Sequence, residues 1–336
     1  MANKVTIQVG NRSKTVLAPE SWDDLDDRTF LLFYSTLFTN PGDEFTQTGF
    51  TIVKLLSMAQ HILGADSAML SQWEAHCLKQ DPEFGEAVFL DELRQVLHFT
   101  IGGLFEVGED EDGNTTYSCK LNRTRNVWPV IASPPAPLRG RGGKASPQPS
   151  PRETGRTRTL YAPADKLSNV TIYELGAAFS LFEAFLQTNK EEYALELLGT
   201  IYRPSRGQTK AEREQGWKSG DRRVPYRDFE AKAKERAKLF KTLPGLTLRA
   251  ILFWFAGCRQ SIVEAYPKVF KKQGEGGRAG ANYGWGGVLL SIAGGPVGLE
   301  AVADQHHSNA LTFLSMKEDE AVEMERQLEE AKRGRR

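Results

Sequence analysis

A stretch near the middle of the chain cannot belong to a packed core, and it divides the sequence into two foldable parts. Residues 133–159 are rich in proline and glycine, carry six Lys/Arg against one acid, and show no apolar periodicity. Such a segment buries too little apolar surface to offset the entropy that is lost on ordering. We therefore predict a disordered linker or insertion at residues 131–160.

Two interpretations of this stretch stay open. Residues 138–152 resemble interspersed DNA repeats that are translated inside bacterial reading frames, which would make the stretch an accidental insertion. Alternatively, its basic residues form an arm that binds nucleic acid. The loss of nucleic-acid affinity after deletion would favour the arm.

Charge is separated along the sequence, although 43 basic and 43 acidic residues cancel overall. Residues 20–112 contain 19 acids and four bases, a net charge of −15. Residues 116–336 contain 36 bases and 24 acids, a net charge of +12. Opposed charge blocks predict two surfaces that attract each other or recruit different partners.

Apolar periodicity predicts a mainly α-helical protein with bundle-like regions and small antiparallel β elements. Alternation in residues 5–17 around Gly10-Asn11 indicates a hairpin, and a second pair of strands is expected within residues 104–121. Helical patterns occur at residues 30–38, 50–63, 69–78, 87–101, 175–186, 193–201, 229–240, 246–263, 288–293 and 308–333.

We expect four parts along the chain. They are an acidic helical region with a small β element (1–130), the linker (131–160), a helical domain (161–305), and a charged C-terminal helix and tail (306–336). Two helix starts carry local signals. Ser21 is the expected N-cap of a first turn that holds Asp23 and Asp24, and Thr171 and Glu174 have the spacing of a capping box.

Motifs of catalysis and metal binding do not occur in the sequence. It has no GxSxG, HExxH, GxxxxGK[ST] or CxxC pattern. Its three cysteines lie far apart in the sequence, which predicts reduced thiols that bind no metal. The adjacent pair His306 and His307 indicates a solvated helix start, and the glycine-rich residues 274–280 indicate a loop and not a phosphate cradle. We expect no enzyme, no cofactor and no metal site.

The basic residues 203–241 are the main candidate for a nucleic-acid site. They include thirteen Lys/Arg and six acids, with aromatic residues interleaved, a composition that suits phosphate neutralisation and base stacking. The same charges would also suit a solvated helix or docking on the acidic half. The candidate contact residues, for nucleic acid or a protein partner, are Arg206, Arg213, Trp217, Lys218, Arg222, Arg223, Tyr226 and Arg227.

The C-terminal residues form a thin apolar stripe within a charged helix. The stripe consists of Leu311, Leu314, Ala321, Met324 and Leu328. Its spacing fits packing on a partner helix as well as a frayed terminal helix. The longest apolar run, residues 250–258, is too short to cross a bilayer, and the N-terminus lacks a signal-peptide core, so we expect no membrane association.

Several segments resemble poorly characterised proteins encoded in tail and structural gene clusters of phages and prophages of Bacteroidota-type bacteria. The segments are residues 18–25, 160–175, 197–204, 254–258, 266–267 and 283–285, which together contain 42 of the 336 residues. The stretch at 131–160 interrupts the pattern, and the resemblance brings no known catalytic or metal-binding residue.

The resemblance implies a non-enzymatic interaction protein of a phage or prophage particle-assembly module, either a tail-assembly factor or a minor structural component. Its partners would be other structural or assembly proteins, in the host cytoplasm or in the virion. A nucleic-acid-binding accessory protein that uses residues 203–241 is the alternative. Homo-oligomer formation stays open.

Overall fold

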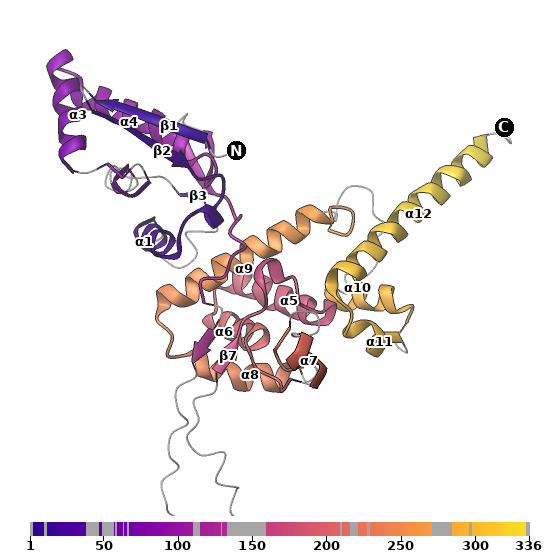
Figure 1. Cartoon of the computed structure of the whole chain (residues 1–336). Coiled ribbons are helices and arrows are strands. Elements are labelled where there is room, and N and C mark those ends of the chain that lie inside the picture. The colour runs from indigo at the N-terminus through magenta and orange to yellow at the C-terminus, as the bar shows by residue number, and fades with distance from the viewer. Residues whose placement is uncertain are drawn as a thin grey trace, which may run out of the picture. The chain divides into compact units, whose positions relative to one another are not determined.

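The computed structural model contains two compact units (Figure 1). The first combines Met1–Arg125 with Gly245–Gln260, and the second combines Asn126–Pro244 with Ser261–Arg336. The structure describes residues 3–9, 12–37, 47–48, 57, 59–62, 64–65, 67–109, 115–128, 130–132, 159–208, 210–215, 221–226, 229–270, 284–295 and 298–333. The predicted class, mainly helical with small antiparallel sheets, is confirmed.

The first unit begins with the predicted hairpin. Strands β1 (Asn3–Val9) and β2 (Arg12–Ala18) pair antiparallel. Ser21 caps the short helix η1 (Trp22–Asp24) as expected, because its side chain accepts a hydrogen bond from the Asp23 amide. The other elements of residues 27–119 are α1 (Asp27–Leu37), β3 (Gln47–Thr48), α3 (Ser67–Gln80), α4 (Gly85–Ile101), β4 (Phe105–Glu109) and β5 (Thr115–Cys119).

The three short strands form an antiparallel sheet in the order β3-β5-β4, which confirms the pair expected within residues 104–121. The helix predicted at 50–63 lies mostly outside the described residues.

Trp22 is the centre of the first unit's core. Its ring makes edge contacts with Phe30, Phe105 and Phe253, at centroid distances of 5.9, 5.6 and 5.4 Å. Phe253 belongs to α9 (Gly245–Ala265), whose Trp254 indole donates to the Thr124 carbonyl oxygen over 2.8 Å. The core of this unit is therefore completed by a segment that the sequence-based division assigned to residues 161–305.

The second unit is built on three helices: α5 (Ile172–Thr188), α6 (Glu191–Ile201) and α8 (Phe229–Phe240). Helices α6 and α8 approach closely at Gly199, where a Cβ atom would lie 2.3 Å from the Ala233 carbonyl oxygen. The remaining elements are β6 (Val130–Ala132), β7 (Thr159–Tyr161), η3 (Asp165–Leu167), β8 (Arg203–Pro204), α7 (Lys210–Gln215), α10 (Gly284–Ala293), α11 (Leu299–Ala303) and α12 (His307–Arg333).

The ends of the predicted linker meet in one sheet. Strands β6 and β7 pair antiparallel with Ala132 opposite Thr159, and β7 also pairs with β8. The chain thus leaves and re-enters this sheet at neighbouring points. Residues 133–158 and the glycine-rich residues 274–280 lie outside the described residues. Among the helices that are described, none has the length and apolar character needed to cross a membrane.

Candidate functional site

The start of α5 turns a carboxylate into the protein. Thr171 caps the helix as predicted, because its hydroxyl accepts a hydrogen bond from the Glu174 amide at 3.3 Å. The other half of the predicted capping box does not form. The Glu174 side chain is fully buried and binds two arginines instead of the Thr171 amide. Guanidinium groups offer stronger, charge-assisted hydrogen bonds than a backbone amide does.

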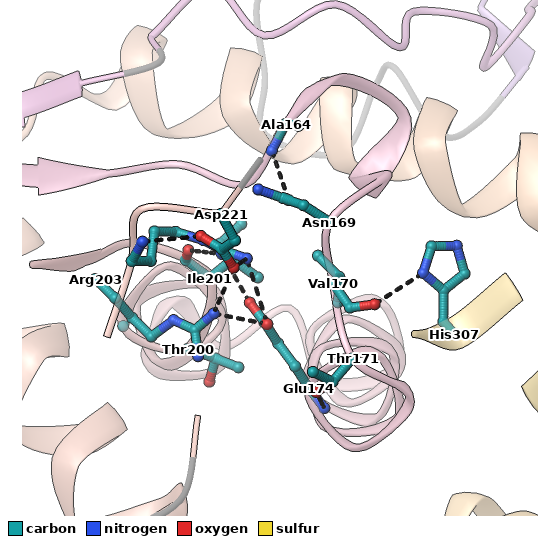
Figure 2. A network of polar contacts seen from close by, with 12 residues as sticks. Ala164, Asn169, Val170, Thr171, Glu174, Thr200, Ile201, Arg203, Asp221 and His307 are labelled. Carbon is teal, nitrogen blue, oxygen red and sulfur yellow. Dashed lines mark hydrogen bonds and ion pairs between the residues drawn. The ribbon is translucent and has the colours of Figure 1, made fainter. Parts of the chain in front are cut away.

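The buried residues Glu174, Arg203 and Arg223 and the partly exposed Asp221 form a cluster, which we call the arginine–carboxylate cluster. Figure 2 shows Glu174, Arg203 and Asp221 of this cluster. Arg203 Nη2 lies 2.7 Å from Glu174 Oε2, and Arg223 Nη1 lies 2.8 Å from Glu174 Oε1. Arg223 also donates from Nε and Nη2 to the two Asp221 oxygens, both at 2.9 Å. Its Nη1 reaches the Ile201 carbonyl oxygen at 2.7 Å.

Charge balance explains how two cations are tolerated in this interior. Burial lowers the pKa of Arg203, and the neighbouring Glu174 carboxylate opposes that effect only in part. Burial acts on Arg223 in the same way, but Glu174 and Asp221 together outweigh it and raise its pKa. Because arginine keeps its proton in proteins, the cluster is suited to joining α5, β8 and residues 221–223 and not to proton transfer.

Neighbouring groups extend the cluster toward α7 and α8. Arg206 pairs with the buried Glu212 of α7 at 2.5 Å and donates to the Asp221 carbonyl oxygen at 3.3 Å. Arg236 of α8 donates to the Gly199 carbonyl oxygen. The Arg203 guanidinium lies 5.5 Å from the centre of the Tyr226 ring. These contacts connect both ends of the segment between α6 and α8, which contains β8 and α7, to the neighbouring helices.

The candidate contact residues occupy different environments. Arg223 and Tyr226 are buried, and Arg206 is engaged by Glu212. Arg222 lies over the Tyr161 ring at 3.9 Å, while Arg213 is exposed on α7. Trp217, Lys218 and Arg227 lie outside the described residues. The structure therefore brings Arg206 and Arg223 together around Asp221, and the assignment of the whole set to a binding surface stays a prediction.

The expectation of a solvated start for the last helix is wrong at His307. This side chain is 5% exposed, and its Nδ1 donates to the Val170 carbonyl oxygen over 2.9 Å (Figure 2). The His306 ring stacks on it with a centroid distance of 4.6 Å. Burial lowers the pKa of His307, and the neighbouring His306 lowers it further against the effect of the Val170 hydrogen bond. The pair anchors α12 to the start of α5.

Beyond this anchor, α12 leaves apolar side chains uncovered. Its buried residues are all within the first two turns, and every residue from Met316 to Arg333 is exposed. Met324 and Leu328 are 64% and 62% exposed. A rotation of about 100° per residue places Phe313, Leu314, Ala321, Met324 and Leu328 on one side, which we call the α12 stripe. Figure 1 shows α12 continuing past α10 and α11.

The remaining ionisable groups and the comparisons with known proteins add no assignment. In the part of the chain that the structure describes, no three His, Cys, Asp or Glu residues are grouped as a metal site would require. Searches of protein-family models, curated proteins and solved structures found no match to this chain.

Proposed function

We propose that the chain is a non-enzymatic interaction protein that binds another protein through α12. The observation that supports this function is the α12 stripe, on a helix whose buried residues all lie in its first two turns. Contiguous exposed apolar surface on a soluble protein marks an interaction site.

The biological setting is proposed on the resemblance given above. It assigns the chain to a phage or prophage particle-assembly module, as a tail-assembly factor or minor structural component. A pull-down of the tagged full chain from the host after prophage induction tests both statements. Recovery of tail or capsid proteins, with and without nuclease, is the expected result, and a Met324→Asp/Leu328→Asp variant should lose them. Recovery that is unchanged in this variant would contradict the role of α12.

Binding of nucleic acid through residues 203–241 is a second candidate function. Lys234 and Lys238 lie one turn apart on α8, and both are exposed together with Lys241 just beyond the helix. This function predicts that the affinity for nucleic acid falls as the salt concentration rises. For each phosphate neutralised, the logarithm of the binding constant should fall by about 0.7–0.9 for every tenfold rise in salt. Weak binding that vanishes at physiological salt would reject it. If only this affinity falls on deletion of residues 133–158, that stretch is an arm.

A further inference from the structure

The acidic residues of α12 fall into two groups. Residues 318–330 contain seven acids and one arginine, a net charge of −6. Four of the acids have partners: Asp319 pairs with Lys268 at 2.6 Å, and Glu323, Glu329 and Glu330 pair with arginines of α12. The other three, Glu318, Glu320 and Glu325, form no ion pair with any residue that the structure describes.

The unpaired acids border the α12 stripe. In heptad terms Leu314, Ala321 and Leu328 occupy position a, and Lys317 and Met324 occupy position d. Glu318 and Glu325 then occupy position e, and Glu320 occupies position g, the positions that face the flanks of a partner helix. The helix therefore presents a seam that is apolar except for Lys317, with Glu318 and Glu325 on one side and Glu320 on the other.

From Met316 to Arg333, α12 has no buried residue that would pack it against the rest of the described structure. Residues 316–333 are exposed, and ion pairs within the helix stabilise it by only about 0.2–0.5 kcal/mol each. Most of the stability of a helix in a protein comes from tertiary packing of its apolar face. A partner that covers the seam would supply the missing apolar contacts.

A second copy of the chain is a poor partner for this seam. In a parallel pair, Lys317 would face Lys317 of the second copy, and Glu320 would face Glu325. In an antiparallel pair, positions e and g each face their own kind. Glu318 then faces Glu325 or, in a register shifted by one heptad, Glu318 faces Lys332 while Glu325 faces Glu325. Like charges at these positions disfavour association.

We infer that the α12 stripe binds an amphipathic helix of another protein that carries Lys or Arg beside its apolar seam. The inference rests on the proposed function and adds the chemical class of the partner. A basic helix would neutralise Glu318, Glu320 and Glu325 while its apolar residues cover the stripe.

Two labelled peptides of about four heptads test the inference on the full chain. Both carry Leu at positions a and d; one has Lys at e and g, and the other has Glu there. Fluorescence anisotropy should show binding of the Lys peptide and at least about tenfold weaker binding of the Glu peptide. Leu328→Asp should weaken binding of the Lys peptide by about tenfold or more.

Charge-reversal variants provide a matched pair. Glu320→Lys/Glu325→Lys should weaken binding of the Lys peptide by about tenfold and strengthen binding of the Glu peptide. Glu323→Lys/Glu330→Lys changes the net charge equally on the other side of α12 and should alter either affinity by less than about threefold. Unchanged melting temperatures would show that these exposed substitutions leave the fold intact.

Three results would overturn the inference. Equal affinity for both peptides would show that charge does not select the partner. A dimer in sedimentation that Leu328→Asp abolishes would assign the stripe to a second copy. Stripe-dependent recovery of host-expressed partners without any preference for the Lys peptide would leave the proposed function standing and reject the basic helix.

Discussion

At the scale of single residues, Glu174 balances two buried arginines. Glu174→Gln keeps the shape of the side chain but leaves Arg203 and Arg223 with Asp221 as their single anionic neighbour in the cluster. Removing one partner of a buried ion pair costs about 3–5 kcal/mol. We expect urea denaturation to show a loss of this size in the free energy of unfolding of the second unit.

The exposed Glu192 of α6 gives the matched control. Glu192→Gln removes the same charge from the same unit and should change stability by less than about 0.5 kcal/mol. Equal stabilities for the two variants would show that the cluster does not brace this unit.

His307 makes the stability of the second unit depend on pH. Its folded pKa is lowered, so the unfolded chain binds a proton more readily. The stability that the neutral His307 side chain contributes to the second unit is therefore fully present above the unfolded pKa of about 6.5. It is lost as the pH falls through the folded pKa. His307→Gln, whose amide can still donate to Val170, should reduce the fall in melting temperature between about pH 7.5 and 5.5.

His76→Gln, at an exposed position of α3, should leave the fall in melting temperature unchanged. An identical pH dependence in the His307 variant and the original chain would contradict the assignment.

At the scale of elements, Gly257 of α9 permits a close approach to the segment that carries Arg123. A Cβ atom at Gly257 would lie 2.1 Å from the Arg123 carbonyl oxygen, a backbone atom that cannot move aside alone. Gly257→Ala should therefore destabilise the first unit by about 2–3 kcal/mol, measured by thermal unfolding. Gly245→Ala in the same helix meets open space and should be neutral or slightly stabilising. Similar losses in both variants would refute the steric explanation.

Most elements were predictable from the sequence because their signals are local. Helix α8 matches the predicted residues 229–240, and Thr171 caps α5 as expected. The arginine–carboxylate cluster was not predictable, because Glu174 lies 29 and 49 positions from its two arginines. No spacing rule connects residues so far apart, and the local pattern around Glu174 indicated a cap.

At the scale of the whole molecule, the fold keeps the charge separation of the sequence. The first unit contains 12 basic and 19 acidic residues, and the second contains 31 and 24, so their net charges are −7 and +7. Composition thus predicted the separation. It did not predict that Gly245–Gln260 joins the first unit, since a buried apolar helix suits either core.

The segments that make up the first unit predict which fragments of the chain fold on their own. A fragment of residues 1–130, cut at the sequence-based boundary, lacks Phe253 and Trp254, whose partners include Trp22 and Thr124. The absence of such large core side chains costs several kcal/mol, comparable to the stability of a small domain. We expect this fragment to melt without cooperativity. A single chain that joins residues 1–125 to 245–260 through a Gly/Ser linker should melt cooperatively, and Phe253→Ala should abolish that transition. Cooperative unfolding of the 1–130 fragment alone would show that α9 is dispensable to this core.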